Sequence, residues 1–199
     1  MSVIRGETSK AFARRAASGW FRQFIADPGI DIGAGDDPLN HTFRRWDKHD
    51  GDATAMASVP DETFRTVYAS HLLEHLDDPD AALRNWWRIL QPGGCLIVVV
   101  PHRDLYERKV ALPSRWNSEH KTFWLPDRDE PPVTRSLAGT VGRVLGNPRI
   151  EYVEVVDEGW QAVPLQEHPV GEYSIEVVVR KQAPRASAGP TGDLREGGV

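Results

Sequence analysis

The residues best suited to ligand binding follow a short apolar segment, where Asp31, Gly33 and Gly35 form the pattern Asp-x-Gly-x-Gly. Glycines let the backbone turn sharply and approach a ligand closely. In an open α/β sheet, ligands bind beyond the carboxyl ends of the strands, where this loop would lie. A dinucleotide loop needs a third glycine where this chain has Pro38, and the acidic pair 36–37 would repel a pyrophosphate. The loop favours a ligand that carries positive charge and a ribose; the simpler alternative is an acidic turn without a ligand.

The following residues predict the elements that would hold such a loop. Residues 64–70 form a predicted strand, and Asp78 and Pro79 suit the N-cap and the first position of a helix. The segment 91–94, Gln-Pro-Gly-Gly, would end that helix. Residues 95–100 are almost continuously apolar, as in a strand that is buried on both faces. This order of elements predicts an α/β fold with a parallel sheet.

Several blocks of the sequence together resemble one known family. They are Asp31–Gly35, Gly51-Asp52-Ala53, Val67–Leu76, Asp78-Pro79, Ala82-Leu83 and Ile89–Pro101, the last with Leu90-x-Pro92-Gly93-Gly94-x-Leu96. In order and spacing they resemble class I S-adenosylmethionine (SAM)-dependent methyltransferases, and among these the small bacterial ubiquinone/menaquinone-methylase-like (type 11) group. The resemblance implies SAM as cofactor, which carries an ammonium, a sulfonium and a ribose. It also implies a Rossmann-like three-layer sandwich of the seven-stranded type, with a mostly parallel sheet and an antiparallel C-terminal edge.

The first α/β unit is expected to be unusually short. Only eleven residues separate Gly35 from Asp47, which is too few for a full helix and a strand. Residues 41–47 are the candidate second strand, so we expect the fold to be shortened there. Residues 9–26 have an amphipathic pattern and predict one helix that packs on the sheet or covers the cofactor.

The C-terminal part predicts one helix and two strands. The helix is expected over 133–145, and the strands over 150–156 and 173–180 should form the antiparallel edge. Residues 1–181 are expected to be one methyltransferase domain. Residues 182–199 have no aromatic side chain and are rich in Gly, Ala and Pro, which predicts a disordered tail.

The resemblance assigns residues to the methionine end of SAM. Asp31 and the backbone at Gly33 and Gly35 would surround its amino-acid part. Ser70 and His71, at the end of the predicted strand, would lie beside its methionine chain. His71 is also a candidate catalytic residue.

The resemblance also assigns residues to the adenosine end. An acid after the second strand would bind the ribose hydroxyls, and Asp47 is the expected residue with Asp50 as the alternative. Asp52 would accept a hydrogen bond from the adenine amino group, and Ala53 would pack near the ring. The simpler alternative for Asp47 and Asp52 is that both are solvated turn carboxylates.

The methyl acceptor is expected to bind along the polar segment that follows the buried strand. This segment is long, and long segments inside a compact domain are usually functional or disordered. The expected acceptor contacts are His102, Tyr106, Arg115 and Trp116. His120 is the candidate base for a hydroxyl acceptor, because an imidazole titrates near neutral pH. The alternative is that His120 only anchors the segment.

His71, Glu74 and His75 form the sequence H-x-x-E-H, which can also mark an inverted zinc-peptidase helix. Residues 77–79, Asp-Asp-Pro, interrupt any helix there after one turn. We therefore expect no metal ligands and take a zinc hydrolase as the less favoured alternative. A non-catalytic SAM-binding module is the other alternative, because no catalytic base is obvious.

Composition limits the class of protein and its partners. The chain has 199 residues, 40% of them hydrophobic, and a net charge of −5, which argues against non-specific binding to nucleic acid. Its single cysteine excludes an internal disulfide. No apolar run approaches the ~20 residues of a membrane span, and no signal peptide is evident. We expect a cytoplasmic enzyme whose partner is a small-molecule or glycan acceptor.

Overall fold

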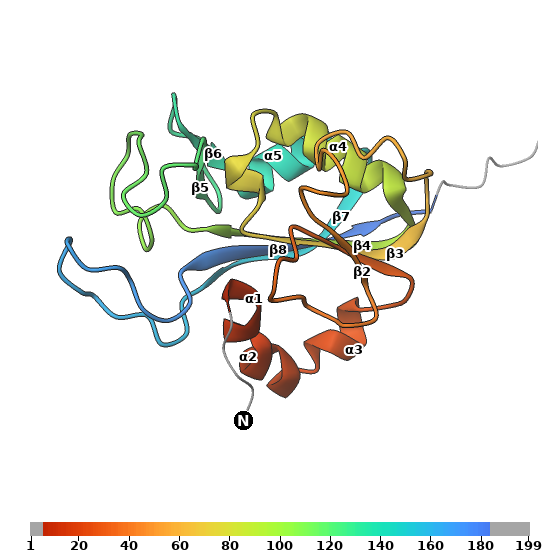
Figure 1. Cartoon of the computed structure of the whole chain (residues 1–199), viewed down its shortest axis with the longest axis horizontal. Coiled ribbons are helices and arrows are strands. Elements are labelled where there is room, and N and C mark those ends of the chain that lie inside the picture. Colours follow the sequence, from red (N-terminus) through yellow and green to blue (C-terminus); the bar gives the residue numbers. More distant parts are fainter. Residues whose placement is uncertain (1–5, 184–199) are drawn as a thin grey trace, which may run out of the picture.

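A computed structural model describes residues 6–183 of the chain. Its main sheet has the strand order β2-β1-β3-β4-β8-β7 (Figure 1). These strands are β1 (Gly29–Ile32), β2 (Arg44–Trp46), β3 (Phe64–Ser70), β4 (Leu90–Pro101), β7 (Pro148–Val156) and β8 (Ser174–Lys181). The first four are parallel, and β8 is antiparallel to both of its neighbours, β4 and β7. The predicted parallel sheet with an antiparallel C-terminal edge is confirmed.

Helices cover both faces of this sheet and make three layers (Figure 1). Helices α4 (Pro79–Ile89) and α5 (Leu137–Val144) lie on one face, and α1 (Glu7–Lys10), α2 (Phe12–Ala17) and α3 (Trp20–Phe24) lie on the other. Alternate side chains of β4 enter the two cores: Leu96 and Val98 face the α4–α5 side, whereas Ile97 and Val99 face α3. The strand reads as continuously apolar because both of its faces are buried.

Local signals placed α4 correctly. The Asp78 side chain accepts a hydrogen bond from the Ala81 amide at 2.8 Å, and Pro79 occupies the first turn. Residues 91–94 fall within β4, but its pairing with β3 moves from Leu90 directly to Cys95, so the Gln-Pro-Gly-Gly segment bulges out of the sheet.

Two helix predictions need correction. The single helix expected over 9–26 is instead α1, α2 and α3, and Gly19, at φ 74°, turns the chain before α3. The helix expected over 133–145 starts at Leu137, because the preceding residues form β6 (Thr134–Ser136), which pairs with β5 (Phe123–Leu125) in a second, two-stranded sheet. The Ser136 hydroxyl then caps α5 by accepting from the Gly139 amide at 2.9 Å.

The shortened first unit is confirmed. Residues 33–43 join β1 to β2 without a helix, and β2 is the edge strand. Residues 47–63 form turns and irregular backbone, so the main sheet described here has six strands and not the seven of the expected type. Residues 184–199 of the predicted tail lie outside the described part of the chain. Within residues 6–183, no helix is long and apolar enough to cross a membrane.

Candidate functional site

A cavity of about 1230 Å3 lies at the carboxyl ends of β1, β2 and β3. It is lined by three segments at these strand ends and by two residues of the later polar segment. The lining residues are Gly33, Gly35, Asp36, Arg45 to Ala53, Leu72, His75, Leu76, Glu119 and Lys121. This is where an α/β sheet of this topology binds ligands. Five of the predicted cofactor residues line it: Gly33, Gly35, Asp47, Asp52 and Ala53.

The glycine loop is held in shape by the end of β2. Gly33 and Gly35 have φ values of 78° and 48°, which glycine adopts without steric cost. The Gly33 amide donates to the Trp46 carbonyl at 2.7 Å, and the Gly35 amide donates to Asp47 Oδ1 at 3.0 Å. Two hydrogen bonds therefore fix the loop against the wall that would hold a ribose.

Asp31 lies beneath this loop and is only 2% exposed. Its Oδ2 accepts from the Leu39 amide at 2.7 Å. Burial raises the pKa of Asp31 to about 7, with Asp47 nearby acting in the same direction, while the Leu39 amide and Arg45 oppose the rise. A carboxyl group beside a cavity whose pKa is raised to near neutral pH by burial is a candidate functional group.

The predicted adenosine residues lie on one stretch of the cavity wall. Asp50 Oδ2 accepts from the Asp47 amide at 2.9 Å, and Asp52 Oδ1 accepts from the Thr54 amide at 2.8 Å. The Ala53 carbonyl accepts from the Trp86 indole at 2.9 Å, which attaches this stretch to α4. The Asp50 side chain thus fixes the backbone at Asp47.

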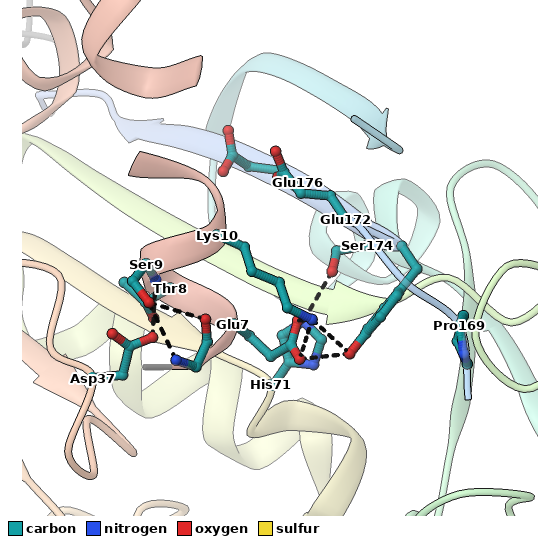
Figure 2. Close-up of polar contacts among 12 residues, drawn as sticks. Glu7, Thr8, Ser9, Lys10, Asp37, His71, Pro169, Glu172, Ser174 and Glu176 are labelled. Carbon is teal, nitrogen blue, oxygen red and sulfur yellow. Dashed lines mark hydrogen bonds and ion pairs between the residues drawn. The ribbon is translucent and has the colours of Figure 1, made fainter. Parts of the chain in front are cut away.

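Ser70 is the last residue of β3, and His71, which follows it, lies on the side that α1 covers (Figure 2). The buried Ser70 hydroxyl makes no hydrogen bond within residues 6–183. His71 Nε2 lies 2.9 Å from the Ser174 hydroxyl and 4.0 Å from Glu7 Oε2. Burial lowers the pKa of His71 to about 4, so its ring is neutral at pH 7. His71 has a φ of 52°, a conformation that is uncommon for a non-glycine residue.

Helix α1 is attached to both sides of this corner. The Tyr173 hydroxyl donates to Glu7 at 2.5 Å, and Lys10 donates to Glu7 and to Tyr173 (Figure 2). The Ser9 amide donates to Asp37 in the loop after Gly35 at 2.9 Å. A second cavity of about 550 Å3 lies between the N-terminal helices and residues 36–41. The N-terminal segment therefore covers the corner where β1 and β3 end.

The four expected acceptor contacts line neither cavity. Tyr106 is buried, with its ring centroid 5.6 Å from that of His120, and its carbonyl accepts from the Trp116 indole. Arg115 is exposed and donates to the Glu107 carbonyl at 3.1 Å. His102 Nδ1 accepts from the amide of residue 104. These side chains brace the polar segment, whose Glu119 and Lys121 reach the larger cavity.

His120 is buried in a cluster with two carboxylates, one of which the sequence did not indicate. Its Nδ1 lies 2.7 Å from Glu107 Oε1, and its Nε2 lies 3.9 Å from Glu74 Oε1. His75 Nε2 is 3.8 Å from the same Glu74 oxygen, and His75 also lines the larger cavity. Burial raises the pKa of Glu74 to about 8, and Glu107 acts in the same direction. Glu107 lies 13 residues from His120, so no local pattern pairs them.

The inverted zinc-peptidase alternative is wrong in its geometry. That motif requires one helix to present both histidines, but only Leu73–His75 form a single 3₁₀ turn, η1. His71 lies outside this turn and faces Ser174. Within the described residues, Glu74, His75 and His120 nevertheless place their ligand atoms within 4.8 Å of one another.

Comparison with known proteins agrees with this arrangement. A family model described as a methyltransferase domain matches residues 23–98, which include the glycine loop, the adenosine stretch and His71. The comparison with curated proteins gives no match.

Solved structures share the fold at low sequence identity. A protein studied in the conversion of a disulfide bond into a thioacetal group during echinomycin biosynthesis has 15% identity and a TM-score of 0.55, over 86% of this chain and 82% of that chain. The (4+2)-cyclase SpnF has 14% identity and a TM-score of 0.54, over 92% and 86%. A candidate methyltransferase from Bacillus halodurans has 12% identity and a TM-score of 0.54, over 86% and 100%.

These likenesses show the fold, and the matched domain adds the activity and its cofactor. The narrower resemblance to ubiquinone/menaquinone-methylase-like enzymes stays a prediction. The methyltransferase-domain match over residues 23–98 supports a SAM-dependent methyltransferase, and the Rossmann-like sheet is consistent with the class I fold.

Proposed function

We propose that this methyltransferase transfers the methyl group of SAM to a hydroxyl oxygen of a small or sugar-containing acceptor. The observation that carries the proposal is the larger cavity, whose wall combines the glycine loop, the carboxylates of Asp47 and Asp52, and His75. The imidazole of His120 lies directly behind His75, with ring centroids 4.7 Å apart. Cofactor residues therefore line the cavity, and the buried candidate base packs against one of its wall residues.

We propose that SAM lies with its methionine end at Asp31, Gly33, Gly35, Ser70 and His71. The Asp31 carboxylate would attract the ammonium group, and the unpartnered Ser70 hydroxyl would gain a hydrogen bond. A neutral His71 would not repel the sulfonium. These three features suit a cationic ligand, as the loop composition predicts.

The adenosine end would extend along the opposite wall. Asp47 would bind the ribose hydroxyls through charge-assisted hydrogen bonds. Asp52 and Ala53 would contact the adenine, with Leu72 and Leu76 supplying apolar surface in the same cavity.

The reaction would be an in-line displacement, in which a lone pair of the acceptor oxygen attacks the methyl carbon. The carbon–sulfur bond breaks, S-adenosylhomocysteine leaves, and the hydroxyl proton must be removed. We assign the activation of the hydroxyl to His120, because Glu107 holds Nδ1 and leaves Nε2 facing the cluster beside His75. His71, next to the methionine end, is the second proposed catalytic residue. Glu119 and Lys121 would contact the acceptor from the same polar segment.

Binding is tested first with S-adenosylhomocysteine. A ligand at 100 times its dissociation constant should add ~2.7 kcal/mol to the free energy of unfolding. That corresponds to a rise of roughly 5–11 °C in Tm for a domain of this size. NADH should produce no shift. A shift with NADH and none with S-adenosylhomocysteine would contradict the placement of the cofactor.

Transfer is tested with methyl-labelled SAM and acceptors that present hydroxyl, amine or thiol groups on sugars and small aromatic molecules. The expected product is a methyl ether. His120→Ala should lower the rate by roughly 10²–10⁴-fold with little change in S-adenosylhomocysteine affinity. The exposed His41→Ala is the matched control. Methylation of amines or thiols alone would contradict the oxygen assignment, and binding without any turnover would favour a SAM-binding module.

A further inference from the structure

The most unusual group in the cluster is the carboxylate of Glu74. Its side chain is fully buried, and neither oxygen has a hydrogen-bond partner within residues 6–183. Imidazole nitrogens of His71 and His75 lie 3.8 Å, and one of His120 lies 3.9 Å, from Glu74 Oε1. These distances are too long for hydrogen bonds. A buried carboxylate without partners is costly, so this arrangement points to a missing positive partner.

The backbone holds the three side chains together. The amides of Lys121 and Thr122 donate to the Glu74 carbonyl, at 2.8 and 3.3 Å, which brings residue 120 beside the η1 turn. Glu74 and His75 both come from that turn. The cluster therefore depends on main-chain pairing and not on mobile side chains.

The size of the gap suits a small cation. The ligand atoms of Glu74, His75 and His120 lie within 4.8 Å of one another. Ligands at ~2.0–2.1 Å from a tetrahedral zinc ion are roughly 3.4 Å apart. The two distances to Glu74 Oε1, 3.8 and 3.9 Å, would need to contract by about half an ångström. The distance between the two imidazole nitrogens, at most 4.8 Å, would need to contract by up to about 1.4 Å.

Glu107 supplies the support that metal-bound histidines usually have. Its Oε1 is 2.7 Å from His120 Nδ1, and its other oxygen accepts from the Ser114 hydroxyl and the Arg115 amide. A carboxylate on Nδ1 keeps the proton there and leaves the Nε2 lone pair for a metal.

We propose that Glu74, His75 and His120 bind a divalent transition-metal ion of the zinc type, with an open coordination position toward the cavity. Two imidazoles and one carboxylate are a ligand set that zinc accepts, and an open fourth position is typical of catalytic zinc. His75, which is 27% exposed and lines the cavity, marks the open side.

The consequence for catalysis rests on the proposed function. The acceptor hydroxyl would occupy the open position, the metal would lower its pKa, and its proton would leave to water. The oxygen lone pair would then form the bond to the methyl carbon as the carbon–sulfur bond breaks. In this arrangement His120 activates the hydroxyl by holding the metal.

The test is a titration of the untagged, chelator-treated full chain with Co²⁺, followed by visible absorption, which reports coordination of the metal directly. We expect saturation at one equivalent and displacement by Zn²⁺. Absence of a saturable signal, or a stoichiometry unrelated to one site, would overturn the proposal.

Variants locate the site. Glu74→Gln and His120→Asn should weaken Co²⁺ binding more than 100-fold, and Glu107→Gln should weaken it roughly 10- to 100-fold. The exposed His41→Asn is the control and should bind as the parent does. Undiminished binding by Glu74→Gln would overturn the assignment. If that variant fails to fold, His75→Asn gives the same test at a partly exposed position.

S-adenosylhomocysteine binding, measured by calorimetry on the same samples, separates the two proposals. Metal binding without S-adenosylhomocysteine binding would leave the metal site standing and contradict the proposed cofactor placement. The reverse result would contradict only the metal site.

Discussion

The Asp31 carboxylate offers the sharpest test of the proposed cofactor site, because its effects on stability and on binding should oppose each other. Burial raises its pKa from the ordinary value of 3.8 to about 7. The unfolded chain therefore loses this proton near pH 4, whereas the folded chain keeps it to about pH 7. Between these values the folded state binds more protons, so the free energy of unfolding falls as pH rises.

The size of this effect follows from the difference in pKa. A difference of about three units corresponds to about 4 kcal/mol, reached when pH passes 7. Asp31→Asn removes the titration and keeps an oxygen that can accept from the Leu39 amide. We expect the variant to match the parent near pH 4 and to be more stable by up to about 4 kcal/mol at pH 8. That difference corresponds to roughly 8–16 °C in Tm.

Cofactor binding should change in the other direction. A hydrogen bond to a charged group contributes about 1.5–3 kcal/mol. Replacing the carboxylate by an amide should therefore weaken binding of S-adenosylhomocysteine at pH 8 by about 10- to 100-fold. A gain of stability together with a loss of binding is typical of a residue kept for function.

The assays are calorimetric unfolding at pH 4, 6 and 8 and isothermal titration with S-adenosylhomocysteine at pH 8. Asp36→Asn is the matched control, because Asp36 is exposed in the same loop and should not alter the pH dependence of stability. An Asp31→Asn protein that is less stable at pH 8, or whose stability difference does not vary with pH, would refute the argument from burial. Unchanged affinity would refute the contact with the ammonium group.

Three further changes test the glycine loop, the buried Arg15–Glu176 ion pair and the segment that joins β7 to β8. Gly33→Val should abolish S-adenosylhomocysteine binding while circular dichroism stays unchanged, because φ is 78° and a β-branched side chain is strained there; retained affinity would move the site elsewhere. Glu176→Gln should lower the free energy of unfolding by about 3–5 kcal/mol in urea titrations, because it leaves the buried charge of Arg15 unpaired. A loss below about 1 kcal/mol would show that water solvates the Arg15 guanidinium in the variant. Gly171→Ala should cost about 1–3 kcal/mol by the same method, since φ is 79° and a Cβ would lie 2.3 Å from the Gly159 backbone; an unchanged midpoint would mean that this turn relaxes freely.

Much of the fold could be predicted because its signals are local. The strand over 64–70, the α4 start at Asp78 and Pro79, and the antiparallel pair near 150–156 and 173–180 each depend on residues that are close in sequence. Periodicity, capping and glycine turns act within a few residues, so these signals can be recognised in the sequence without knowledge of the tertiary contacts.

The predictions that failed concern segments whose neighbours are distant. The helix expected from residue 133 starts later because Thr134–Ser136 pair with Phe123–Leu125. No pattern within residues 133–145 predicts this strand pairing. The helix expected over 9–26 divides where Gly19 takes a positive φ, and its pieces follow the contacts of Glu7 and Arg15 with residues near the C-terminal strands.

The methyltransferase fold, the SAM cofactor and the edge of the sheet at which a ligand is expected could be predicted from residues 31–101, because the order of strands and the glycine loop place that edge. Only the tertiary structure brought Glu107, His120 and Glu74 together, through backbone hydrogen bonds between residues almost fifty positions apart. Only burial in that structure gives Asp31 and Glu74 their raised pKa values, because the cost of desolvating a carboxylate depends on what surrounds it and not on its neighbours in the chain.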